Sequence, residues 1–300
     1  MARPISRSVI AATLCTLPAL PAMAQDRPVV AASNYPLAYF AERLGEGVAD
    51  VVFPIPADAD PSFWRPAISD IAAIQSADLI ALNGAGFATW PTKASLPRSR
   101  TVDTSASFSD RFIKTDTVTH SHGDGGAHSH TGVASYTWLD FELASMQAST
   151  LSEAMIRRMP DSAALITENR DALLAELAAL DARAAEVGAG ADGVTIITSH
   201  PRYQYFGAAY GLNTVALEWD AKTDPTDAQW DALQSVIADT DAGLFVWEAA
   251  PSEGSRARLA ALGISDVVFP PMANRGDETS FIAGMTASLD ALDAALTELQ

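Results

Sequence analysis

The sequence contains a single cysteine, Cys15, which lies inside an apolar run near the N-terminus. The basic residues Arg3 and Arg7 precede this run, and the small-residue segment "AMA" (22–24) follows it. A basic start, an apolar stretch and a small-residue cleavage site are typical of a secretory signal peptide. We therefore predict a cleavable signal peptide over residues 1–24 and a chain that is exported to the periplasm.

Cleavage after residue 24 leaves no cysteine in the mature chain. This excludes disulfide bonds and thiolate metal ligands. Lipid attachment at Cys15 is not expected, because Leu14 stands before it, where a lipoprotein signal has a small residue. The remaining residues are enough for one large domain or for two lobes that each bury a core.

Long hydrophobic runs and basic charge are also scarce. After the signal peptide, no stretch approaches the ~18 apolar residues that a transmembrane helix needs. Without Arg3 and Arg7, 17 basic residues stand against 37 acidic ones, a balance of −20. A negative field of this size argues against a nucleic-acid partner and mildly favours the capture of cations. Acidic surfaces also keep exported proteins soluble, so the charge permits a metal-binding function without showing one.

Motifs that would indicate an enzyme are missing. Ser199 and His200 are adjacent on a predicted strand, where successive side chains point to opposite faces, so they cannot form a nucleophile–base pair. The Gly-x-Gly of "NGAGF" (83–87) lacks the remainder of a phosphate-binding fingerprint. We predict that the protein is not an enzyme.

The sequence does contain two blocks in which β-rich runs alternate with helical patterns. The first block has "RPVVAASNY", "DVVFPIP", "ADLIALNGAG" and "TVDTS", and the second has "VTIITSH", "NTVALEW", "GLFVWEAA" and "SDVVFPPM". These runs are nearly continuous in apolar residues, as expected of parallel strands buried on both faces. Two alternating blocks predict an α/β fold with two lobes, each a mostly parallel sheet flanked by helices.

One long helix is predicted between the two blocks. After Pro160, the helical pattern starts at the capping residue Asp161 and stops before Gly188, a length of about 40 Å at 1.5 Å per residue. Such a rod would bridge both lobes rigidly. We predict an N-terminal lobe over residues 28–159, a linker helix over 160–188 and a C-terminal lobe over 191–300.

Four of the five histidines lie in the segment "HSHGDGGAHSH" (120–130). Its glycines, serines and aspartate have the composition of a loop, which we place at residues 119–132. A flexible loop can wrap several imidazoles around zinc. The candidate metal ligands in this histidine-rich segment are His120, His122, His128 and His130.

Three further motifs carry a family resemblance. They are "DADPSFWRPAISDIAAIQSADLIALNGAGFATW" (58–90), "SYTWLD" (135–140) and "SHPRYQYFGAAYGL" (199–212). In their order and spacing, the chain resembles the periplasmic zinc- and manganese-binding proteins that deliver metal to ABC importers. The resemblance implies a metal site between two lobes and an ABC permease in the inner membrane as partner. It implies zinc as the bound ion, with manganese or another divalent metal as the alternative. We also predict a monomeric protein.

The ligand positions that the resemblance implies are mostly altered. Members of the family commonly use three histidines and a carboxylate, and these positions fall here on Ser62, Tyr136, His200 and Pro270. Only His200 retains a usual ligand. Hydroxyl oxygens of serine and tyrosine are poor zinc ligands unless they are deprotonated.

Three functions therefore remain open at this point. In the leading hypothesis the protein captures a divalent metal with the histidine-rich segment, and His200 with a nearby carboxylate, Glu248 or Asp277, holds it in the cleft. In the second, the cleft of a divergent carrier binds a non-metal ligand or a metal chelate. In the third, the protein is a periplasmic zinc buffer or chaperone that docks with no permease.

Overall fold

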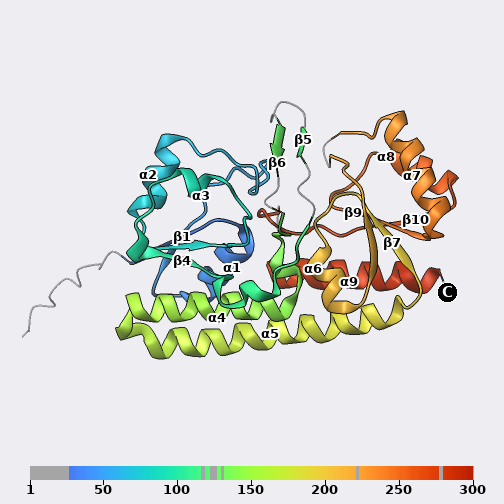
Figure 1. Cartoon of the computed structure of the whole chain (residues 1–300). Helices are drawn as coiled ribbons and strands as arrows, with labels where there is room; N and C mark the ends of the chain where they lie inside the picture. The colour runs from blue at the N-terminus through green and yellow to red at the C-terminus, as the bar shows by residue number, and fades with distance from the viewer. Residues whose placement is uncertain are drawn as a thin grey trace, which may run out of the picture.

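The computed structural model describes residues 27–115, 119–121, 127–129, 132–220, 223–276 and 280–299. The predicted signal peptide lies outside these residues. Two sheets stand side by side above a layer of long helices, one sheet in each half of the molecule (Figure 1). Within the described part of the chain, no helix combines the length and the apolar character needed to cross a membrane.

The N-terminal lobe is built on a parallel sheet with strand order β2-β1-β3-β4. Its strands are β1 (Val29–Ala32), β2 (Asp50–Val52), β3 (Leu79–Leu82) and β4 (Thr101–Asp103). Its helices are α1 (Tyr35–Leu44), α2 (Ile68–Ser76), the short α3 (Trp90–Lys93) and α4 (Phe141–Arg158). Alternate residues of β1 face different cores: Val30 packs toward the long helices and Ala31 toward the outer cluster that holds Trp64. Burial on both faces explains the continuous apolar runs in the sequence.

The C-terminal lobe repeats this plan with strand order β10-β9-β7-β8. Its strands are β7 (Thr195–Thr198), β8 (Asn213–Ala216), β9 (Leu244–Trp247) and β10 (Ser265–Val268). Its helices are α6 (Gln204–Tyr210), α7 (Asp227–Thr240), α8 (Glu253–Ala261) and α9 (Phe281–Glu298). From β7 the chain continues to β8 on one side of the sheet and then to β9 on the other side. The loops that leave β7 and β9 therefore run in opposite directions. In open parallel sheets this is the place where ligands usually bind.

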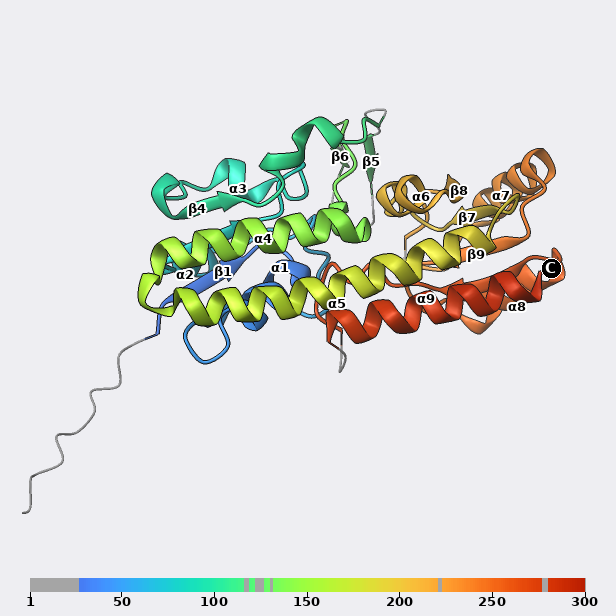
Figure 2. The same cartoon turned by 90° about the horizontal axis from the view of Figure 1, so that it is seen from below.

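Helix α5 (Ala163–Gly190) bridges the lobes, as the sequence predicts. Its 28 residues span about 42 Å at 1.5 Å per residue. It packs against α1 and α4 in one half and against α6 and α9 in the other, and Figure 2 shows it running beneath both. One hydrophobic cluster continues through both halves, from Phe40 and Trp138 to Phe269 and Phe281. The lobes therefore share a core.

The helix runs further than its sequence pattern indicates, because Gly188 continues it instead of ending it. A Cβ atom at Gly188 would lie 2.1 Å from the carbonyl oxygen of Tyr210, which follows from the close approach of α5 and α6. The glycine is needed for packing between the helices. The sequence alone shows only its helix-breaking tendency.

The histidine-rich segment contains two short strands where we predicted a loop. Strand β5 (Thr119–Ser121) pairs antiparallel with β6 (Ala127–Ser129), and His120 stands directly opposite His128 in the ladder. This β5–β6 hairpin lies between the two lobes at the top of Figure 1. His122 and His130 fall outside the described residues.

An ion pair joins α1 to α5. Arg43 donates two hydrogen bonds to Glu176, of 2.7 and 2.6 Å, and these bonds hold the pKa of the Glu176 carboxyl below its usual value. Both side chains remain about one third exposed, which weakens the pair through solvent screening.

Substitution Glu176→Gln is therefore expected to lower the free energy of unfolding at pH 7 by about 0.5–1 kcal/mol. The folded pKa is lower than the unfolded one, so this contribution is complete above pH 4.5 and disappears as the pH falls through the folded value. Urea unfolding of both proteins at pH 7 and pH 3.5 measures the change. A difference that grows on acidification would contradict this account.

Candidate functional site

The altered ligand positions come together where the lobes meet. Ser62 lies in the loop between β2 and α2, and Tyr136 lies just before the 3₁₀ turn Thr137–Leu139. His200 follows β7 by two residues and is buried. Pro270 follows Phe269 after β10 and is exposed, and its hydrocarbon side chain has no atom that could bind a metal. We call the surroundings of Ser62, Tyr136 and His200 the inter-lobe site.

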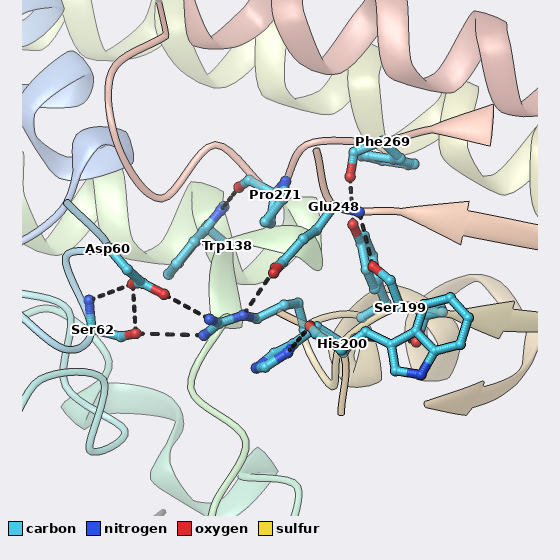
Figure 3. A network of polar contacts seen from close by, with 12 residues as sticks. Asp60, Ser62, Trp138, Ser199, His200, Glu248, Phe269 and Pro271 are labelled. Carbon is cyan, nitrogen blue, oxygen red and sulfur yellow. Dashed lines mark hydrogen bonds and ion pairs between the residues drawn. The ribbon is translucent and has the colours of Figure 1, made fainter. Parts of the chain in front are cut away.

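An arginine side chain occupies the inter-lobe site. Nη2 of Arg202 lies 2.6 Å from Oδ2 of Asp60, and its Nε lies 3.3 Å from Oε2 of Glu248. Nη1 of Arg202 donates to Oγ of Ser62 at 3.4 Å. In Figure 3, Asp60 and Ser62 reach this guanidinium from one side and Glu248 from the other. The contacts join the two lobes, because Asp60 and Ser62 belong to the first and Arg202 and Glu248 to the second.

Aromatic rings complete the enclosure of the guanidinium. Its central carbon lies 4.5 Å from the ring centre of Tyr136 and 5.6 Å from that of Phe63. A cation over an aromatic face is stabilised by the ring quadrupole, most strongly when water is excluded. Only 5% of the Arg202 side chain is exposed to solvent.

The charges at the site follow from this packing. Burial alone would lower the pKa of Arg202, but Tyr136, Asp60 and Glu248 together raise it above its usual value, so the guanidinium stays charged. Burial raises the pKa of Glu248, and the nearby Arg202 opposes this rise. Burial also raises the pKa of Tyr136 well above 10, so the phenol stays protonated at neutral pH. In this state its oxygen is that of a neutral phenol and not of a phenolate.

The loop of the N-terminal lobe presents Asp60 through a local turn. Oδ1 of Asp60 accepts hydrogen bonds from the backbone nitrogen and from Oγ of Ser62, at 2.8 and 2.6 Å. This arrangement leaves Oδ2 for Arg202. At the altered histidine position, Ser62 thus orients a carboxylate toward the arginine.

His200 is oriented by the backbone of its own lobe. Its Nδ1 lies 2.9 Å from the carbonyl oxygen of Trp219, and since a carbonyl only accepts, Nδ1 carries the proton. With the proton on Nδ1, a neutral imidazole has its lone pair on Nε2, the tautomer that suits a metal ligand. Among the residues that the structure describes, however, no three His, Cys, Asp or Glu side chains converge to hold an ion.

Of the two candidate carboxylates, only one lies among the residues that the structure describes. Glu248 lies at the inter-lobe site, where its carboxylate is engaged by Arg202. Asp277 lies outside the described residues. The sequence reading missed Arg202 itself, although it stands in the third motif. The sequence feature that could have indicated its role is its position two residues after His200, in a chain where the other usual ligand positions are altered.

A small pocket lies next to the inter-lobe site, inside the C-terminal lobe. It has a volume of about 210 Å³ and opens at the carboxyl ends of β7 and β9, where Ser199, Trp247 and Glu248 line it. Pockets for organic ligands usually measure about 300–1,000 Å³. The pocket is therefore small for the non-metal ligand of our second hypothesis.

Comparisons with known proteins fit this fold. The model of a family described as the periplasmic component A of the zinc-uptake complex, ZnuA, matches residues 30–295. The high-affinity zinc uptake system protein ZnuA of Bacillus subtilis is 26% identical over 196 residues, which cover 64% of this chain and 61% of that protein. The manganese-binding lipoprotein MntA of Halalkalibacterium halodurans is 24% identical over 203 residues, or 67% and 64% of the two chains. The alignments thus span less than two thirds of either relative.

Solved structures show the same architecture. The Zn(II)-bound ZnuA-like domain of AdcA from Streptococcus pneumoniae superposes with a TM-score of 0.75 at 19% identity, covering 90% of this chain and 99% of that domain. The family match confirms the resemblance predicted from the three motifs, and the superposition confirms the two-lobed fold. The names of the relatives include both zinc and manganese, consistent with the predicted metals. A family of uptake components also agrees with the prediction that the chain is not an enzyme.

Proposed function

The chain belongs to the ZnuA family of periplasmic zinc-uptake components, and from this premise we propose that it is the substrate-binding protein of an ABC importer for a divalent metal. Zinc is the proposed cargo, with manganese as the alternative. We place metal capture on the β5–β6 hairpin with its four histidines, and not on the inter-lobe site. The proposed form is a monomer that is exported by its signal peptide and docks on an inner-membrane permease.

The register of the hairpin carries this proposal. His120 and His128 are paired residues in an antiparallel ladder, where the Cα atoms of opposite residues lie about 4.5–5.5 Å apart. Each strand therefore brings one histidine to the same level of the hairpin. His122 and His130, two positions along the chain from these, raise the number of imidazoles to four. Four nitrogen ligands are the full set for tetrahedral zinc.

The state of the inter-lobe site supports the same conclusion. Its two carboxylates are engaged by Arg202, and its tyrosine is a neutral phenol. A hydroxyl, a phenol and one imidazole make a weak set for zinc. We therefore assign the inter-lobe site no part in binding the free ion.

A zinc titration by calorimetry tests the proposal. The mature chain is compared with a hairpin variant, in which His120, His122, His128 and His130 are replaced by glutamine, and with His200→Ala as the matched single-histidine control. We expect one zinc ion per mature chain, no measurable binding by the hairpin variant, and unchanged affinity for His200→Ala. Manganese should bind more weakly, because it prefers oxygen ligands.

The opposite pattern would move the metal to the inter-lobe site. If His200→Ala abolishes tight binding while the hairpin variant keeps it, the inter-lobe site holds the ion and the hairpin is an accessory. Circular dichroism of each variant establishes that the fold is retained, so that a loss of binding reports on the ligands.

A further inference from the structure

We propose that the guanidinium of Arg202 is a built-in cation that occupies the inter-lobe site, joins the two lobes without a bound ion and excludes divalent metals from that position. The inference does not depend on metal capture by the hairpin. It rests on the contacts of Arg202 with both lobes and on a second cross-lobe attachment of the same loop.

The loop that carries Asp60 is held from the C-terminal lobe at two points. Arg202 binds the Asp60 carboxylate at 2.6 Å and the Ser62 hydroxyl at 3.4 Å. Asn274, which follows β10, donates to the carbonyl oxygens of Pro56 and Ala59 at 2.7 Å each. The N-terminal loop 56–62 is thus attached to the opposite lobe at both of its ends.

The cation suits this place because of its shape. A guanidinium is planar and offers several N–H donors in one plane, so it can serve two carboxylates at once while an aromatic ring covers its face. Arg202 does this between Asp60 and Glu248, with Tyr136 on its face. Asp60 belongs to one lobe and Glu248 to the other. Arg202 binds both carboxylates and so makes the connection between lobes that a bound ion would otherwise make.

The same contacts exclude a divalent ion. An entering ion would meet a positive charge that is already paired, and it would have to displace Arg202 from both carboxylates to gain ligands. The displaced guanidinium would remain buried without its partners, and an unpaired buried charge is strongly unfavourable. The inter-lobe arrangement is therefore expected to be the same with and without metal in solution.

Hydrogen exchange measured by mass spectrometry tests the inference on the mature chain. The readout is amide exchange in residues 58–64 and 200–206, recorded in EDTA and in saturating zinc. The variant is Asp60→Asn, because its amide oxygen can still accept from Ser62 while the charge that pairs with Arg202 is removed. Asp192→Asn, at an exposed turn between α5 and β7, is the matched control.

We expect the unsubstituted chain to exchange these segments at the same slow rate in EDTA and in zinc. Asp60→Asn should accelerate exchange in residues 58–64 about tenfold, again regardless of zinc, and the control should not. The inference is overturned if zinc slows exchange in these segments of the unsubstituted chain, or if Asp60→Asn exchanges like it. Failure of zinc to bind the hairpin would leave both readouts unchanged, so the two proposals fail separately.

Discussion

Replacing Arg202 with methionine lowers the free energy of unfolding by roughly 3–5 kcal/mol, the range expected when one partner of a buried ion pair is removed. Methionine has a similar length and fills the space between the lobes, so the loss reports on charge more than on volume. Glu248, of which only 12% is exposed, keeps its carboxylate without the guanidinium that stabilises it. Asp60 is 32% exposed and is hydrated more easily, so Glu248 should account for most of the loss. Urea unfolding at pH 7, followed by circular dichroism, measures the difference.

A second substitution separates the pair from its surroundings. In Arg202→Met with Glu248→Gln, the buried carboxylate is gone together with the guanidinium. The double variant should therefore be destabilised by less than the sum of the two single changes. Strict additivity would show that the contact between Arg202 and Glu248 contributes nothing, and would leave packing as the only cause.

The second large effect is expected at Trp138, where Trp138→Ala should lower the free energy of unfolding by about 3–5 kcal/mol. The indole is fully buried, and its ring lies 5.3 Å from Phe87 and 4.6 Å from Tyr136 between ring centres. Its Nε1 donates to the carbonyl oxygen of Pro271 at 2.8 Å, on the segment that leaves the C-terminal sheet. Removing the indole leaves a cavity in the core and an unsatisfied carbonyl at the lobe boundary.

Trp138→Phe divides these two contributions. Phenylalanine keeps most of the apolar contacts but cannot donate to Pro271, so we expect a loss of about 1–2 kcal/mol for the hydrogen bond and the smaller ring. Thermal and urea unfolding of both variants supply the values. Equal losses for alanine and phenylalanine would mean that the hydrogen bond, and not the packing, dominates at this position.

Much of the fold could be predicted from the sequence, because its determinants are local. Parallel strands that are buried on both faces have continuous apolar runs in the sequence. In β7 and β9, successive residues pack alternately into the hydrophobic clusters on the two sides of the sheet. The long helix after Pro160 was predictable because its buried leucines, such as Leu173, Leu177 and Leu180, recur with helical spacing and because a proline precedes it. Gly188 shows the limit, since its role depends on α6, which approaches only in the folded chain.

The inter-lobe site was less accessible to sequence reasoning. Ser62, Tyr136 and His200, which the three motifs single out, all lie at the inter-lobe site. What fills the site depends on contacts across 142 residues, from Arg202 to Asp60, and across 46 residues, to Glu248. No local pattern marks such a pairing. The pairing of Arg202 with Asp60 and Glu248 is therefore visible only when both lobes are in place.

The shared core along α5 also determines how the molecule comes apart. Its stripe of Ile166, Leu173 and Leu180 is covered by helices of both halves, so a fragment containing either sheet alone would expose apolar surface that normally contacts the other half. Neither lobe is therefore an independent thermodynamic unit. Heat or denaturant should melt the two sheets in a single cooperative transition, and a half-length fragment should aggregate instead of folding.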